Sequence, residues 1–184
     1  RSTAKRTYKY TYSYTALEQQ TIGGVSTTTI RNKAKEIIRK NEGSDTSVNP
    51  DDNGALSIGR MQWHGANALQ LLRIIVSMNP DDAYNKLGSA LYNEITSSGT
   101  SWAKRTVTSS EKTKIAALLG TSNGKAAQDE LEASYLAQYI NNAYDRGLRN
   151  AAAVVYYADI ENQTGSGGSA TCVTYAANLA GSRS

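Results

Sequence analysis

The chain has 184 residues, of which 39% are hydrophobic and 20% charged, a composition typical of one folded domain of ordinary size and not of a disordered chain. The net charge is +4. A basic surface suits an anionic polymer or is simply solvated, and because no nucleic-acid motif accompanies it we expect no nucleic-acid partner. One cysteine and one histidine exclude an internal disulfide and a zinc site of usual ligand spacing, so we expect no metal and no cofactor. No apolar run is long enough to cross a bilayer and no secretory signal opens the chain, so we expect no membrane insertion.

Residues 1–29 are expected to form an N-terminal arm. Its tyrosines alternate with polar residues, the period-two pattern of a strand; they are Tyr8, Tyr10, Tyr12 and Tyr14. Gly23-Gly24 then breaks the chain. The strand could pair with a hairpin of the domain or with a neighbouring subunit or domain, or it could lie on the domain as an ordered arm.

The next segment predicts a short amphipathic helix with a glutamate at its end. One face of a helical period carries Ile30, Ala34, Ile37 and Ile38. Glu42 continues this apolar stripe, so its carboxyl group should be partly desolvated. A general acid that works at neutral pH needs such an environment, because desolvation disfavours its charged form. The alternative is a helix-terminal glutamate turned to solvent. Gly43 lets the chain leave the helix.

A polar loop rich in turn formers follows. Asn53-Gly54 indicates a tight hairpin turn, and residues 55–58 suit a short strand. The hairpin would carry a second carboxylate, from Asp51 or Asp52, back toward Glu42. Paired carboxylates in different environments are the machinery of glycoside cleavage. For one of the two aspartates we expect ordinary turn chemistry instead.

The rest of the chain predicts helices. They are expected at residues 65–77, 80–96, 108–119, 125–146, 148–162 and 170–180, with a capping box at Thr108 and a glycine-rich loop at 165–168. The broad apolar face of the first suggests a central, mostly buried helix. No repeat is present, and we expect no linker that would divide the chain into two folds. The predicted fold class is mainly α (α+β), a helical domain with a small β-hairpin.

At this point the sequence resembles a known family. Glu42-Gly43, Asp51 and Ser57-Ile58-Gly59 look like the Glu, Asp, Ser/Thr arrangement of phage-type lysozymes, at similar spacing. Ser57-x-Gly59-x-x-Gln62 also resembles the Gly-Leu-Met-Gln segment of soluble lytic transglycosylases and goose-type lysozymes. The run through Trp63-His64-Gly65 is similar to glycosidase domains of phage endolysins and tail lysins of Gram-positive hosts. The resemblance covers roughly residues 30–75.

This resemblance implies a lysozyme-like catalytic domain over residues 30–184, with the hairpin flanking an active-site cleft. It implies cleavage of the β-1,4 glycan strands of bacterial peptidoglycan, by a phage-encoded or virion-associated protein acting at the cell wall. Glu42 would be the acid and Asp51 the second carboxylate, and Ser57, Gln62, Trp63 and His64 would shape the groove. Since lytic transglycosylases lack the second carboxylate, hydrolytic and anhydro-forming mechanisms both remain open.

A second polar cluster closes the helix predicted at residues 148–162. Asp159-Ile160-Glu161-Asn162-Gln163 resembles the Asp-Ile-x-x-Gln-Asn-Gly segment of related phage glycosidases. Amide groups there suit sugar hydroxyls and N-acetyl groups, so Asp159, Asn162 and Gln163 are predicted to bind substrate. The alternative is simple fraying at the end of the helix.

Two other functions stay open. The same fold could serve as a non-catalytic wall-binding or structural domain of a phage tail, contacting other domains or subunits through the N-terminal arm. It could also cleave another amino-sugar polymer, such as chitosan or chitin.

Overall fold

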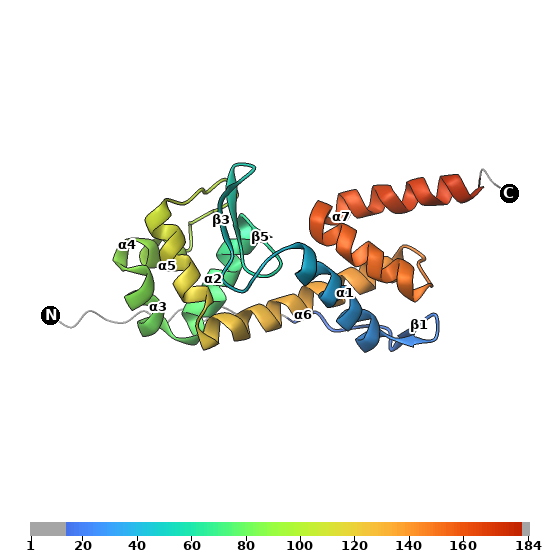
Figure 1. Ribbon diagram of the computed structural model, residues 1–184, viewed down its shortest axis with the longest axis horizontal. Helices are drawn as coiled ribbons and strands as arrows, with labels where there is room; N and C mark the ends of the chain where they lie inside the picture. Colours follow the sequence, from blue (N-terminus) through green and yellow to red (C-terminus); the bar gives the residue numbers. More distant parts are fainter. Residues whose placement is uncertain (1–13, 182–184) are drawn as a thin grey trace. The chain divides into compact units, whose positions relative to one another are not determined.

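The structure is a computed structural model that describes residues 14–181 (Figure 1). Tyr8, Tyr10 and Tyr12 of the predicted strand lie outside the described residues, and Tyr14 belongs to no strand. The fold is mainly helical with a small antiparallel sheet, which confirms the predicted α+β class. The chain divides into two compact units. We call residues 42–131 the sheet unit, and residues 14–41 together with those from 132 onward the helical unit.

Three antiparallel strands give the sheet unit its name: β3 (Val48–Asp52), β4 (Ala55–Ile58) and β5 (Trp63–His64), in the order β3-β4-β5. Asp52 pairs with Ala55 across a two-residue turn. Both turn residues have positive φ, 53° at Asn53 and 90° at Gly54, as the predicted Asn-Gly turn requires. The hairpin is therefore confirmed, and β5 adds a third strand that the sequence did not predict. Every residue of β4 is buried.

Helices α2 (Ala66–Met78), α3 (Pro80–Leu87), α4 (Ser89–Thr96), α5 (Ser109–Leu119) and the first part of α6 (Ser122–Asp145) complete the sheet unit. α2 packs against α3, α4, β4 and β5, as expected from its broad apolar face. The single helix predicted at residues 80–96 is wrong, because Gly88 has φ 77° and ψ 165° and separates α3 from α4. The capping box of Thr108 and Glu111 is present.

An ion-pair cluster fastens the segment before α5 to the sheet. Arg105 pairs with Glu94 at 2.9 Å and with Glu111 at 2.5 Å, and its carbonyl accepts the Leu56 amide at 2.8 Å. Hydrogen bonds from Arg105 hold the pKa of both glutamates below its usual range. β4 is thereby tied to the loop that leads into α5.

The helical unit contains α1 (Thr27–Asn41), the short hairpin of β1 (Thr21–Ile22) and β2 (Val25–Ser26), the rest of α6, and α7 (Ala151–Gly181). Of the predicted apolar face of α1, Ile30, Ala34 and Ile38 are buried and Ile37, at its edge, is half-buried. α1 packs against α7. α7 breaks at Gly165, where φ is 73° and ψ is 177°. The break confirms the predicted interruption, but residues 166–168 are helical and not the predicted loop.

Among the described residues, none of the helices combines the length and the apolar character that crossing a bilayer would require.

The hairpin turn gives a first prediction. An added Cβ meets nothing within 4 Å at Gly54 or at Gly99, but only Gly54 has a positive φ, of 90°. We therefore expect Gly54→Ala to lower the free energy of unfolding by about 1–2 kcal/mol through backbone strain, and Gly99→Ala to leave it nearly unchanged. Urea denaturation of both variants measures the difference. Equal effects would contradict the turn geometry.

Candidate active site

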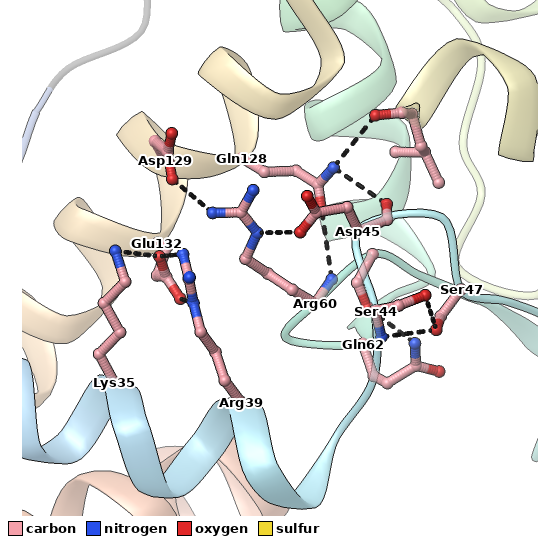
Figure 2. Close-up of polar contacts among 12 residues, drawn as sticks. Lys35, Arg39, Ser44, Asp45, Ser47, Arg60, Gln62, Gln128, Asp129 and Glu132 are labelled. Atoms are coloured by element: carbon pink, nitrogen blue, oxygen red, sulfur yellow. Dashed lines mark hydrogen bonds and ion pairs between the residues drawn. The ribbon is translucent and has the colours of Figure 1, made fainter. Parts of the chain in front are cut away.

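Glu42 is the first residue after α1 and is half-buried. The last turns of α1 are fixed within the helical unit by Glu132 of α6, which is 1% exposed. Arg39 donates to both carboxylate oxygens of Glu132, at 2.6 and 2.5 Å, and Lys35 lies 3.0 Å from one of them (Figure 2). The residues immediately before Glu42 are therefore held by a buried, fully hydrogen-bonded carboxylate.

The loop after Glu42 lies against the turn between β4 and β5. A Cβ on Gly43 would come within 2.7 Å of the Ser47 Oγ and 3.4 Å of the Gln62 Nε2, so this position has no room for a side chain. The Ser47 carbonyl accepts the Gly59 amide at 2.8 Å. Two segments that were singled out by their sequence motifs, around Glu42-Gly43 and around Gly59-x-x-Gln62, are thus in direct contact.

Gln62 closes the β4–β5 turn with a left-handed backbone, φ 49°, that is uncommon outside glycine. Its amide nitrogen Nε2 donates to the Gly59 carbonyl at 2.8 Å. Gly59 has φ 72°, and a Cβ there would lie 2.6 Å from Gln128 Oε1 and 3.0 Å from the Trp63 ring. The side chain of Gln62 is half-buried at the rim of this turn.

A network that sequence reasoning missed holds these two loops (Figure 2). Gln128 of α6 is completely buried. It accepts the Arg60 amide at 3.1 Å and donates to the Asp45 carbonyl at 3.0 Å. Arg60, 4% exposed, forms ion pairs with Asp45, at 2.9 Å, and with Asp129. Gln128 also donates to the nearby Leu119 carbonyl at 3.5 Å. No local pattern marks its link to the two loops, because Asp45 and Arg60 are more than sixty residues away in the sequence.

The structure gives the two hairpin aspartates different roles. Asp51 is exposed and accepts the Gly54 amide at 2.9 Å, the turn chemistry expected of one of the pair. Asp52 Oδ2 accepts the Ser57 hydroxyl at 2.7 Å. The Ser57 Oγ lies 3.1 Å from His64 Nδ1, which lies 3.8 Å from Asp52 Oδ2. The structure therefore groups Ser57 and His64 with Asp52, and places Asp51 in the turn.

Trp63 belongs to the core. Its side chain is 3% exposed and lies under Gly59, and its indole Nε1 is buried with no hydrogen-bond partner among the described residues. It supports the β4–β5 turn from below and presents no open ring face on which a sugar could stack.

The second predicted cluster belongs to the helical unit, on the first part of α7. Gln163 donates to Asp159 at 3.2 Å, and Tyr139 donates to Asn162 at 3.4 Å. The helix continues past all three residues to Gly165, so they do not mark a frayed end.

Glu161, which sequence reasoning did not select, is the buried carboxyl group of this cluster, 4% exposed. Asn142 donates to its Oε1 at 2.8 Å, whereas Oε2 is buried without a hydrogen-bond partner among the described residues. Burial raises the pKa of Glu161 above its ordinary value, and this effect outweighs the lowering by Asn142, Tyr157 and Arg146. The only local signal is the mainly apolar stretch from Ala151 to Ala158 that precedes Glu161 on the same helix.

The described residues contain no group of three or more His, Cys, Asp or Glu side chains that could hold a metal ion. Comparison of the chain with protein-family models, with curated proteins and with solved structures gave no match. The functional argument therefore depends on the residues of the site itself.

Glu161 yields a prediction about stability and pH. A carboxyl group with a raised pKa in the folded state destabilises that state as pH rises from its unfolded pKa through its folded pKa, because the charged form is then buried. We expect Glu161→Gln to raise the free energy of unfolding by about 1 kcal/mol at about pH 8 and to have little effect at about pH 4. Glu36→Gln on α1, whose side chain is 68% exposed, is the control for loss of one charge. Denaturant titrations at both pH values measure the change in the free energy of unfolding. If Glu161→Gln changed it by the same amount at both pH values, the raised pKa of Glu161 would be contradicted.

Proposed function

We propose that the chain is a glycosidase that cleaves the β-1,4 bonds of bacterial peptidoglycan, with Glu42 as the proton donor. The observation that carries this proposal is that the loop after Glu42 lies against the β4–β5 turn. The Ser47 carbonyl accepts the Gly59 amide at 2.8 Å, and the Gln62 Nε2 lies 3.4 Å from where a Cβ on Gly43 would stand. The motif residues that resemble lysozymes and lytic transglycosylases are twenty positions apart, and they meet in one place, beside a hairpin that carries a hydrogen-bonded carboxylate.

The placement of Glu42 suits an acid. It directly follows the last residue of α1 and is half-buried. A half-buried carboxyl group at the start of a loop can reach a substrate while the helix before it fixes its main chain. Such a group can protonate the leaving glycosidic oxygen while an oxocarbenium-like transition state develops on the sugar.

Polar groups near Glu42 suit an N-acetylated sugar. Because the Gln62 Nε2 donates to the Gly59 carbonyl, its Oε1 is directed to accept the N–H of an acetamido group. The net charge of +4 favours adsorption to walls rich in anionic polymer. We propose that the protein acts at the bacterial cell wall, in phage-borne lysis, as the resemblance of the motif implies.

Digestion of purified cell walls tests the proposal. Glu42→Gln keeps the size of the side chain but removes the proton donor, so we expect the release of soluble glycan fragments to fall by about 10²–10⁴-fold. The matched control is Glu36→Gln, six residues earlier on α1 and exposed, which should keep the wild-type rate. Circular dichroism melting should show that both variants are folded.

Mass spectrometry of the fragments reports the mechanism at the same time, since reducing ends indicate hydrolysis and anhydro-sugars indicate a lytic transglycosylase. A Glu42→Gln variant that digests walls at the wild-type rate would refute the role of Glu42. A wild-type protein that binds walls but releases nothing would instead indicate a non-catalytic wall-binding domain. Preferential cleavage of chitin or chitosan would show that the substrate is another amino-sugar polymer, with Glu42 still the proposed proton donor.

A further inference from the structure

We propose that Asp52, and not Asp51, is the second carboxylate of the active site, and that Ser57 and His64 are positioning residues that hold it. The inference deepens the proposed glycosidase function and rests on it. Its basis is the juxtaposition of three side chains from three neighbouring strands, all within the sheet unit.

The sheet brings the three residues together. Asp52 ends β3, Ser57 lies on the central strand β4, and His64 lies on β5. Ser57 and His64 are register partners, so their side chains share one face of the sheet. Ser57 is fully buried, while the side chains of Asp52 and His64 are 36% and 48% exposed. The carboxylate can therefore reach solvent or a sugar while the hydroxyl group that donates to it stays buried.

The single hydroxyl hydrogen of Ser57 determines the direction of the hydrogen bonds. Ser57 donates it to Asp52 Oδ2 at 2.7 Å. The contact of 3.1 Å between Ser57 Oγ and His64 Nδ1 must then be donated by the imidazole, because the serine has no second hydrogen. The chain of donation runs from His64 through Ser57 to Asp52, and it requires a proton on Nδ1. In the neutral ring this leaves Nε2 as an acceptor.

This order differs from that of a nucleophilic serine. In a Ser-His-Asp triad the histidine lies between the other two and accepts the serine proton. Here the serine lies in the middle, is 0% exposed, and has its hydrogen bound to the carboxylate. The cluster therefore orients a carboxylate and does not activate a hydroxyl group.

Asp51 and Asp52 differ in what their side chains contact. Asp51 is exposed and its Oδ1 accepts the Gly54 amide inside the turn, a task that an asparagine oxygen performs equally well. Asp52 accepts from Ser57 at one oxygen and from Asn53, at 3.3 Å, at the other. Asp52 thus has the fixed orientation that a transition-state carboxylate needs.

The variants Asp52→Asn and Asp51→Asn test the assignment, because they make the same substitution at two adjacent positions. On purified cell walls we expect Asp52→Asn to lower kcat by about 100-fold or more, and Asp51→Asn to stay within about twofold of the wild type because its turn hydrogen bond survives. Wild-type rates for Asp52→Asn, or a large loss for Asp51→Asn, would overturn the assignment.

The role of His64 is tested by replacing it with asparagine or glutamine, whose amide groups differ in their distance from the main chain. His64→Asn can place its Nδ2 donor where the imidazole Nδ1 lies, whereas His64→Gln carries its donor one bond further out. We expect His64→Gln and Ser57→Ala to lower kcat by about 10–100-fold with little change in KM, and His64→Asn to recover most of the loss. Equal losses in both His64 variants would mean that His64 contacts substrate directly and does not position Asp52.

A spectroscopic measurement separates this inference from the proposed function. The ¹⁵N spectrum of the single histidine should show the neutral ring protonated at Nδ1 in the wild type and in Asp51→Asn. In Asp52→Asn and Ser57→Ala it should shift toward Nε2 protonation. If Glu42 is essential for wall digestion but these variants leave both rate and spectrum unchanged, the positioning cluster is wrong and the glycosidase stands. If the wild type releases no glycan fragments, the proposed function fails and the catalytic role of Asp52 fails with it, whatever the spectrum shows.

Discussion

The geometry of the candidate site depends on one buried amide. Gln128 is 0% exposed, and a buried amide needs partners for both its oxygen and its nitrogen. Its oxygen accepts the Arg60 amide, and its nitrogen donates to the Asp45 carbonyl and, at 3.5 Å, to the Leu119 carbonyl. Asp45 lies in the loop that follows Glu42, and Arg60 lies in the loop that joins β4 to β5. A shift of the β4–β5 loop would remove the Arg60 donor from the buried oxygen, at a cost of about 1–3 kcal/mol, and a shift of the other loop would remove the shorter hydrogen bond of the nitrogen.

Arg60 reinforces this constraint with charge. It is nearly buried and pairs with Asp45 of the first loop and Asp129 of α6. A buried guanidinium group requires such partners, because an unpaired charge in the interior is far more costly than an unpaired amide. The position of Gln128 also requires a glycine at residue 59, since a Cβ there would lie 2.6 Å from the Gln128 oxygen. Gly59, Arg60 and Gln128 together hold the β4–β5 turn in place.

The sequence predicted the parts of this arrangement that local physics determines. The apolar face of α1, the Asn53-Gly54 turn and the capping box at Thr108 each follow from residues a few positions apart, and all are present. The sequence did not predict β5, because a two-residue strand has no period of its own and exists only by pairing with β4. That pairing places His64 opposite Ser57, so the distinction between Asp51 and Asp52 required the structure. The role of Gln128 was missed because its partners on the two loops are distant in the sequence. The break at Gly88 was missed although the glycine, which adopts a φ of 77°, is visible in the sequence.

Two carboxyl groups of the sheet unit have different surroundings. Glu42 is half-buried at the end of α1, and Asp52 accepts a hydrogen bond from a buried hydroxyl group. Glycoside cleavage uses one carboxyl group as a proton donor and a second as a carboxylate. In the proposed mechanism Glu42 has the first role and Asp52 has the second.

The most direct measurement is a titration of the ¹⁵N-labelled Glu42→Gln variant with a tetrasaccharide of alternating N-acetylglucosamine and N-acetylmuramic acid, followed by amide chemical shifts. The account predicts saturable shifts in residues 42–47 and 59–65, the two loops that Gln128 joins, together with the Asn53-Gly54 turn. Shifts confined to other parts of the chain, or no shifts at millimolar sugar, would contradict a glycan-binding site at Glu42.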